Sequence, residues 1–286
     1  LWAYLSQHPG VFMPGNKEPN YFAFAGATLP EAGPESPEVL QKLLYSYSIT
    51  TPSAYSALFE PARSNQVPGE ASVRYLYSPE APERIKGAVP GVRLIAILRE
   101  PVSRLYSHYC MNRQFGLEPL SLLEAVEAEP ARRREKWGYD WHYVNVSSYC
   151  HQVKRYLDSF DREQIKIFLF DEFKERPMSV FQAVCRHIGV NEQFVPDMSQ
   201  REKVAYSPKS VALERWLHWP NRTRSILEAG LPAGMARSLT SGLEQWNSSP
   251  TPPLEPDVRR QLASLFQSDI ANLEELIGQR IPWGQR

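Results

Sequence analysis

Two long apolar runs stand out from an otherwise mixed pattern of hydrophobic and polar positions along the chain. They are "RLIAIL" at Arg93–Leu98 and "IKIFLF" at Ile165–Phe170, and neither shows the alternation of a half-exposed strand. Near-continuous apolar runs of this length are typical of strands covered on both faces, as in a parallel sheet. We therefore predict two buried parallel strands here, and shorter strands over Val11–Met13 and Ser72–Tyr77.

Apolar positions at helical spacing occupy the segments between and after these strands. They predict helices over Pro101–Asn112, Ser121–Glu129, Ser147–Phe160 and Met178–His187, and one amphipathic helix over Asp257–Ile277. Strands that alternate with helices are typical of an α/β fold, in which helices flank a central and mostly parallel sheet. We therefore expect an α/β fold.

Composition narrows the classes of function. The 286 residues include 32 basic and 32 acidic side chains, so no overall field draws the chain to nucleic acid or to an anionic membrane. No apolar segment is long enough to span a bilayer, and any bound anion needs a local site.

The hydrophobic content of 42% allows one substantial core, so we expect residues 1–286 to form a single domain. Cys110, Cys150 and Cys185 lack metal-ligand spacing, which predicts core thiols in a reducing compartment and no metal.

Polar residues follow the predicted strand Arg93–Leu98 at its carboxyl end, where α/β sheets bind their ligands. Arg99 comes first, and Ser103 and Ser107 then lie four residues apart on one face of the next helix. A guanidinium, free helix N–H groups and hydroxyls together form a polyanion site, most simply for phosphate. An ion pair between Arg99 and Glu100, with ordinary helix serines, explains the same residues equally well.

Several motifs, in the right order, resemble one family. "RLIAILREPVSRLYSHY", preceded by "SPEAPERIKGAVPGV", resembles the 3′-phosphate-binding segment of sulfotransferases that use 3′-phosphoadenosine 5′-phosphosulfate (PAPS). "YLSQHPGVFMPGNKEPNYF" resembles the segment after the family's phosphosulfate loop, and "GEASVRYLYSP" the segment before the next helix. "VSSYCHQVKRYLDSFDREQIKIFLFDEF" resembles its Ser-x-Tyr helix and following strand. The resemblance is strongest to glucosaminyl sulfotransferases of heparan-type glycans and related bacterial enzymes, and it implies a P-loop-like three-layer fold.

The resemblance implies roles for three residues above all. Arg99 and Ser107 would bind the 3′-phosphate of the nucleotide, and Glu18, in "NKEPNYF", matches the catalytic base that deprotonates the acceptor hydroxyl. A carboxylate suits that role when desolvation brings its pKa towards the working pH. Without the resemblance, a surface ion pair with Lys17 is the simpler interpretation of Glu18.

Further candidates surround this set. Ser147 and Tyr149 match the family's Ser-x-Tyr positions near the nucleotide, although Tyr149 can equally serve to pack its helix against the sheet. Lys209 lies in a polar loop where the family closes over the nucleotide, and we assign it as a phosphate contact rather than a solvated lysine. His142 is a candidate second acid/base or acceptor ligand because histidine titrates near neutrality, and a packed loop histidine is the alternative.

The sequence departs from the family at two places. A Lys-x-Gly-Thr-Thr-like phosphosulfate loop and its strand are expected immediately before Leu1, and we expect them upstream in a longer polypeptide because Leu1 begins within a motif. Ala71, in "GEAS", stands where the glycan enzymes carry a catalytic lysine, which Arg74 or Lys17 would have to replace. The basic run Arg132–Arg134 is either a solvated helix end or a surface that recruits an acidic acceptor.

The sequence therefore predicts sulfonate transfer from PAPS to an acceptor hydroxyl, with adenosine 3′,5′-bisphosphate as product and no metal. The loss of the glycan-type lysine favours a β-hydroxyacyl chain on a carrier protein of a polyketide or olefin pathway, and sulfation of a glycan is the alternative. Two alternatives from another class stay open: a P-loop nucleotide kinase, although no Gly-x-x-x-x-Gly-Lys-Ser/Thr motif occurs in these residues, and an inactive nucleotide-binding module. The expected compartment is a bacterial cytoplasm.

Overall fold

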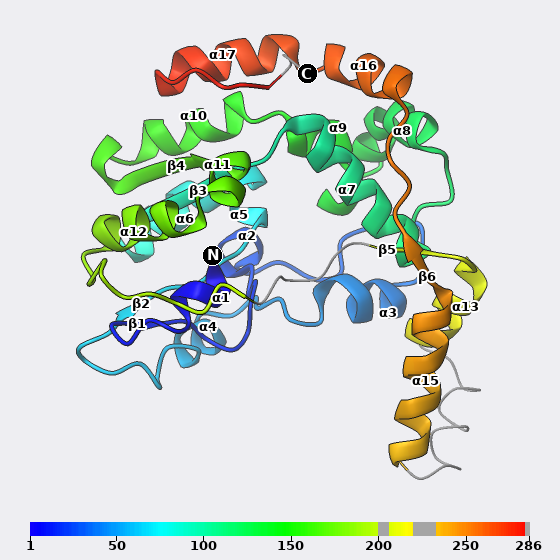
Figure 1. Cartoon of the computed structure of the whole chain (residues 1–286), viewed down its shortest axis with the longest axis horizontal. Coiled ribbons are helices and arrows are strands. Elements are labelled where there is room, and N and C mark those ends of the chain that lie inside the picture. The colour runs from blue at the N-terminus through cyan, green and yellow to red at the C-terminus, as the bar shows by residue number, and fades with distance from the viewer. Residues whose placement is uncertain (200–205, 220–232, 284–286) are drawn as a thin grey trace.

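Three pairs of short strands form the sheets of the protein, seen here in a computed structural model that describes residues 1–199, 206–219 and 233–283 (Figure 1). The parallel pairs are β1 (Val11–Phe12) with β2 (Val67–Pro68) and β3 (Leu94–Leu98) with β4 (Ile165–Leu169). The antiparallel pair is β5 (Tyr206–Pro208) with β6 (Ser248–Pro250). The apolar runs identified in the sequence are thus strands, and they pair in parallel as predicted.

Helices occupy most of the remaining described chain. In the first half they are α1 (Trp2–Leu5), α2 (Tyr21–Phe24), α3 (Pro37–Leu40), α4 (Pro52–Ala57), α5 (Arg74–Tyr77), α6 (Ala81–Ala88), α7 (Pro101–Gln114) and α8 (Leu122–Arg134). In the second half they are α9 (Tyr143–Ser147), α10 (Cys150–Ser159), α11 (Phe170–Glu175), α12 (Pro177–Ile188), α13 (Val211–His218), α15 (Ala233–Asn247), α16 (Pro256–Ser264) and α17 (Gln267–Ile277). A π-helical turn, Gln41–Tyr45, extends α3.

Helices cover both faces of the β3–β4 pair. Successive strand residues point to opposite faces, so each strand contributes alternate side chains to each. One face, with Ala96, Leu98, Ile167 and Leu169, packs against α10 and α17. The other face, with Ile95, Ile97 and Phe168, packs against α12 and α1. The result is a three-layer α/β arrangement, in which α10 and α17 lie on one side of the pair and α12 on the other (Figure 1).

The register of β3 and β4 determines where the first candidate site residue emerges. Leu94 pairs with Ile165, and Leu98 pairs with Leu169, so both strands end at the same edge. The residues that follow, Arg99 and Phe170, are therefore neighbours, with the Arg99 guanidinium carbon 5.5 Å from the centre of the Phe170 ring.

Three predicted elements were wrong in their type or bounds. Ser72–Tyr77 is not a strand: its second half is helix α5, and the strand of this region is β2. The segment predicted as one helix over Asp257–Ile277 is two helices, α16 and α17, separated at Leu265–Phe266. The helix predicted from Ser147 breaks at Ser148, whose extended backbone separates α9 from α10.

A buried ion pair explains one further departure from the sequence-based interpretation. Arg132 is not a solvated helix end, because its guanidinium donates to both carboxylate oxygens of Glu118 at 2.6 and 2.9 Å. Arg133 and Arg134 are exposed, so within this run only they remain available to a partner.

Among the cysteines, Cys185 is buried as expected, while Cys110 and Cys150 are partly exposed. Within the described ranges, no helix is long and apolar enough to cross a membrane.

Candidate functional site

Arg99 presents its guanidinium at the carboxyl edge of the β3–β4 pair. The side chain is half-buried and rests on the face of Phe170, the first residue of α11. Among residues 1–199, 206–219 and 233–283 it has no carboxylate partner. An arginine without a counter-ion at a strand's carboxyl end is well suited to bind an anionic ligand.

Glu100 does not pair with Arg99, so that alternative interpretation is wrong. Its carboxylate accepts hydrogen bonds from the backbone N–H groups of Val102 at 3.0 Å and Ser103 at 2.8 Å. It also accepts a hydrogen bond from the Arg259 guanidinium of α16 at 3.0 Å. Glu100 thus caps α7, and the expectation that free helix N–H groups contribute to the anion site is wrong for the same reason.

The two serines of α7 differ in how their hydroxyls are engaged. The Ser103 hydroxyl donates to the Glu100 carboxylate at 2.5 Å, so it supports the helix cap. The Ser107 hydroxyl has no hydrogen-bond partner in the part of the chain that the structure describes. Ser107 is therefore the serine whose hydroxyl is available to a ligand, while a nucleotide role for Ser103 stays a prediction.

Tyr149 contacts Arg99 directly, whereas Ser147 does not among the described residues. The phenol of Tyr149 donates to the backbone carbonyl of Arg99 at 3.0 Å, and burial raises the pKa of Tyr149 to about 12. Ser147 is fully buried, and its hydroxyl donates to the Tyr143 carbonyl at 2.7 Å and accepts from Arg104 at 3.5 Å. Tyr149 thus supports the backbone of Arg99, and a direct contact of either residue with the nucleotide stays a prediction.

The Glu18 turn is a second unusual feature of the backbone. Glu18 and Asn20, which flank Pro19, have left-handed φ angles of 63° and 54°. Side chains with a Cβ rarely adopt this conformation, and it persists only where the surroundings fix it. Such turns are concentrated at functional sites, which is consistent with a catalytic role for Glu18.

Two neighbouring segments hold the Glu18 turn by hydrogen bonds. On one side, the N–H of Glu18 donates to the Ala71 carbonyl at 3.0 Å, and the N–H of Asn20 donates to the Ser72 hydroxyl at 3.0 Å. On the other side, the N–H of Ile49 donates to the Pro19 carbonyl at 2.8 Å. The turn is therefore fixed between residues 47–49 and 70–72.

Glu70 is a candidate that sequence reasoning missed. Burial raises the pKa of this carboxyl group, and the nearby charge of Glu18 raises it further. Glu70 accepts hydrogen bonds from the Ser72 hydroxyl at 2.8 Å and the Tyr55 hydroxyl at 3.4 Å. Its only sequence signal is the carboxylate in "GEAS", next to Ala71. Glu70 thus belongs to the network that supports the Glu18 turn.

Arg74 does not replace the lysine that the family carries at position 71. Its side chain is buried, with 6% of its surface exposed, and one guanidinium nitrogen donates to both carboxylate oxygens of Asp140 at 2.9 and 2.8 Å. The aromatic rings of Phe24, Tyr45 and Tyr139 surround the guanidinium. Arg74 is therefore part of the core, and the expectation that it compensates for Ala71 is wrong.

Most of the aromatic side chains around the Glu18 turn belong to the core. Phe22, Phe24 and Tyr45 are buried, whereas Tyr47 is 40% exposed. Partial burial raises the pKa of Tyr47, and the charge of Glu18 contributes to the same shift. Tyr47 is thus a partly exposed aromatic side chain near the charge of Glu18.

His142 is a buried histidine at the start of α9. Its Nδ1 shares a hydrogen bond of 2.8 Å with the Tyr77 hydroxyl. Burial lowers the pKa of His142 to about 4, and the positive charge of Arg133 contributes to the same shift. His142 is therefore neutral near neutral pH, so it could accept a proton but is a poor donor. Its catalytic role stays a prediction.

The low pKa of His142 predicts a pH-dependent stability. Between its usual pKa of 6.5 and about 4, the unfolded chain binds a proton that the folded protein does not, so acid favours unfolding. We expect the protonation of His142 to lower the free energy of unfolding by about 2 kcal/mol between pH 7.5 and pH 5. His142→Gln should abolish this part of the pH dependence. Urea unfolding at both pH values checks this; an identical pH-dependent loss in the variant contradicts it.

Lys209 contacts a different part of the described chain from the part that Arg99 contacts. It is exposed, and its ammonium sits 5.5 Å from the centre of the Trp246 ring of α15. Among the described residues it contacts neither Arg99 nor Ser107. The structure thus does not bring Lys209 to the phosphate site, and its role stays a prediction.

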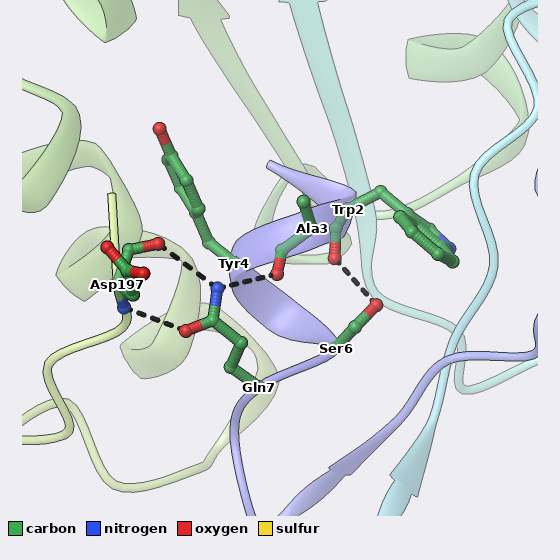
Figure 2. Close-up of a pocket in the computed structure, with 6 residues that line it drawn as sticks. All are labelled: Trp2, Ala3, Tyr4, Ser6, Gln7 and Asp197. Carbon is green, nitrogen blue, oxygen red and sulfur yellow. Dashed lines mark hydrogen bonds between the residues drawn. The ribbon is translucent and has the colours of Figure 1, made fainter. Parts of the chain in front are cut away.

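One surface hollow lies apart from the candidate site residues. It has a volume of about 290 Å³ and is lined by residues of α1 and by Asp197. Figure 2 shows how Gln7 fills its centre: the Gln7 amide donates to the carbonyls of Ala3 and Asp197 and accepts from the Asp197 N–H. The hollow thus lies where the segment around residue 197 packs against α1.

Comparisons with known proteins identify the family. The family model described as "Sulfotransferase domain" matches residues 83–207, which include Arg99, Ser107 and Tyr149. The crystal structure of a sulfotransferase from Alicyclobacillus acidocaldarius is 31% identical, with a TM-score of 0.72, over 98% of this chain and 90% of that one. The chain therefore belongs to the sulfotransferase family and is a transferase, and the expected P-loop-like α/β fold class is confirmed.

Curated relatives are longer proteins. The bifunctional heparan sulfate N-deacetylase/N-sulfotransferase 3 of Homo sapiens is 24% identical over 219 residues, which are 74% of this chain and 23% of the relative. Enzyme 1 of the same name from Caenorhabditis elegans is 20% identical over 75% of this chain and 22% of its own length. The chain thus spans less than a quarter of these relatives.

Proposed function

We propose that the sulfonate donor is PAPS and that Arg99 and Ser107 bind its 3′-phosphate. The observation that carries this proposal is the Arg99 guanidinium at the carboxyl end of β3, half-buried and without a carboxylate partner among the described residues. The Ser107 hydroxyl adds a donor on the following helix. A cation and a hydroxyl suit a phosphate group, and this arrangement of residues needs no metal ion.

We assign Glu18 as the general base of the transfer. It accepts the proton of the acceptor hydroxyl while that oxygen forms a bond to sulfur, and the bond from sulfur to the 5′-phosphate oxygen breaks. The products are the sulfated acceptor, adenosine 3′,5′-bisphosphate and protonated Glu18. Because such a displacement depends mainly on positioning, the double support of the Glu18 turn favours this role. The turn holds a carboxylate whose backbone cannot easily rearrange.

The proposed acceptor is a β-hydroxyacyl chain carried by a carrier protein. Ala71 stands at the position of the family's lysine, and Arg74 is held in the core by Asp140. A site without a cation at position 71 suits an uncharged acceptor better than an anionic glycan. A glycan hydroxyl or amine is the second candidate, favoured by the names of the heparan sulfate relatives.

A transfer assay tests the donor and the acceptor together. Full-length protein is incubated with radiolabelled PAPS and a panel of β-hydroxyacyl carrier proteins, with heparan-type oligosaccharides as the comparison. We expect label on the carrier-bound chain, and mass spectrometry should place it on the β-oxygen. Label on the oligosaccharide alone overturns the acceptor, and transfer that occurs equally well from a donor without the 3′-phosphate overturns the assignment of Arg99 and Ser107.

A further inference from the structure

Two C-terminal helices hydrogen-bond to residues next to Arg99: α17 to the start of α10, whose Tyr149 contacts the Arg99 carbonyl, and α16 to the side chain of Glu100. From these contacts we infer that α16 and α17 position the Arg99 clamp, with Asp269 and Arg259 as the positioning residues. Neither residue needs to touch the nucleotide. The inference rests on the proposed binding of a 3′-phosphate by Arg99.

The first contact runs from α17 through Tyr149. The Asp269 carboxylate accepts hydrogen bonds from the N–H groups of Tyr149 at 2.7 Å and Cys150 at 3.1 Å, which begin α10. The Tyr149 phenol in turn donates to the Arg99 carbonyl at 3.0 Å. Asp269 therefore fixes the backbone of Tyr149. The phenol of Tyr149 in turn fixes the backbone of Arg99.

The second contact runs from α16 to Glu100, the residue that follows Arg99. The Arg259 guanidinium donates to the Glu100 carboxylate at 3.0 Å and lies 3.4 Å from the Ser103 hydroxyl. Glu100 is also the cap of α7, the helix that carries Ser107. Arg259 thus holds the turn between the guanidinium and the hydroxyl of the proposed site.

Apolar packing joins the same elements but leaves a gap at the turn. Leu273 and Ile277 of α17, with Trp283, pack in one cluster with Tyr149 and Leu98. Between Glu100 and α16–α17, however, lies a hollow of about 240 Å³, lined by Phe266 and Trp283 among others. The hydrogen bonds of Asp269 and Arg259 thus add to this apolar packing in fixing the turn.

The sign of the effect separates positioning from direct electrostatics. Asp269 is an acidic residue and a bound phosphate is an anion, so loss of its negative charge alone would leave phosphate binding unchanged or strengthen it. Positioning predicts the opposite. Asn keeps the size of the side chain but loses the charge-assisted hydrogen bonds, so the Tyr149 and Arg99 backbone should become less ordered.

The experiment compares two ligands on the full chain by calorimetry. We expect Asp269→Asn to weaken binding of adenosine 3′,5′-bisphosphate about fivefold and to leave binding of adenosine 5′-phosphate unchanged. Tyr149→Phe, which removes only the phenol oxygen, should give the same selective loss, and in an Arg99→Ala background Asp269→Asn should have no effect. The matched control is Asp158→Asn on α10, where the carboxylate forms an exposed pair with Lys154.

Arg259→Gln extends the test to α16, with Arg260→Gln as its control because Arg260 forms an exposed pair with Asp257. Unchanged or tighter bisphosphate binding by both Asp269→Asn and Tyr149→Phe overturns the inference, and so does an equal loss for both ligands. If Arg99→Ala weakens binding and these variants do not, the anion site stands and the positioning role falls. If Arg99→Ala has no effect, the anion site and the inference fall together.

Discussion

Arg99→Ala is expected to weaken binding of adenosine 3′,5′-bisphosphate roughly 10- to 100-fold, the range for hydrogen bonds between a guanidinium and a phosphate. Arg99 has no carboxylate partner among the described residues, so the substitution leaves no buried charge unpaired and the fold should persist. Titration calorimetry measures the dissociation constant, and binding of adenosine 5′-phosphate should change little.

Arg93→Ala is the matched control for this result. Arg93 lies just before the same strand, at its amino end, where its exposed guanidinium donates to the Glu163 carbonyl at 2.8 Å. A guanidinium at that end of β3 is separated from the proposed phosphate site by the length of the strand, so binding should be unaffected. Equal and tight binding by wild type and Arg99→Ala, or equal losses for Arg99→Ala and Arg93→Ala, would contradict the assignment of Arg99.

Glu18→Gln should lower kcat roughly 10²- to 10⁴-fold, because the amide cannot take the proton of the acceptor hydroxyl. Gln has nearly the same shape as Glu, so the left-handed turn and its hydrogen bond to Ala71 should remain. Steady-state kinetics with the acceptor identified by the transfer assay measure kcat. Calorimetry should find adenosine 3′,5′-bisphosphate bound as in the wild type.

Glu60→Gln serves as the control for Glu18, since Glu60 is an exposed carboxylate in the same half of the chain. It should keep the full rate of transfer. A Glu18→Gln enzyme that binds the nucleotide normally and retains the full rate would remove Glu18 as the base. A loss of nucleotide binding in Glu18→Gln would instead assign it a structural role.

Local pattern was enough to predict the elements that carry the proposed phosphate site. The uninterrupted apolar runs at Leu94–Leu98 and Ile165–Leu169 are strands, and the polar residue that ends the first run lies where parallel strands bind ligands. The resemblance of the segments around them then led to the family that the comparisons confirm. These signals are contiguous in sequence, which is why a single chain reveals them.

The errors arise where distant residues decide the outcome. Ser72–Tyr77 is rich in β-branched and aromatic residues, yet Arg74 folds into a helix whose guanidinium binds Asp140, 66 positions along the chain. Glu100 is adjacent to Arg99 in sequence, but it caps α7 by a local contact and pairs with Arg259 of α16, 159 positions along the chain. The cap is within reach of sequence reasoning, whereas no local pattern encodes the pairs of Arg74 with Asp140 and of Glu100 with Arg259, and tertiary structure overrides intrinsic propensity there.

The carboxylate cap of α7 has a consequence for turnover. Many nucleotide sites complete a helix terminus with the ligand's own phosphate, so that departure of the ligand exposes the helix end. Here Glu100 already satisfies the first N–H groups of α7. The helix is therefore complete without a ligand, and in the proposed mechanism release of the spent bisphosphate requires no unravelling of its first turn. The proposed recognition rests on two side chains, Arg99 and Ser107, so we expect substitutions there to change donor preference without loss of helix stability.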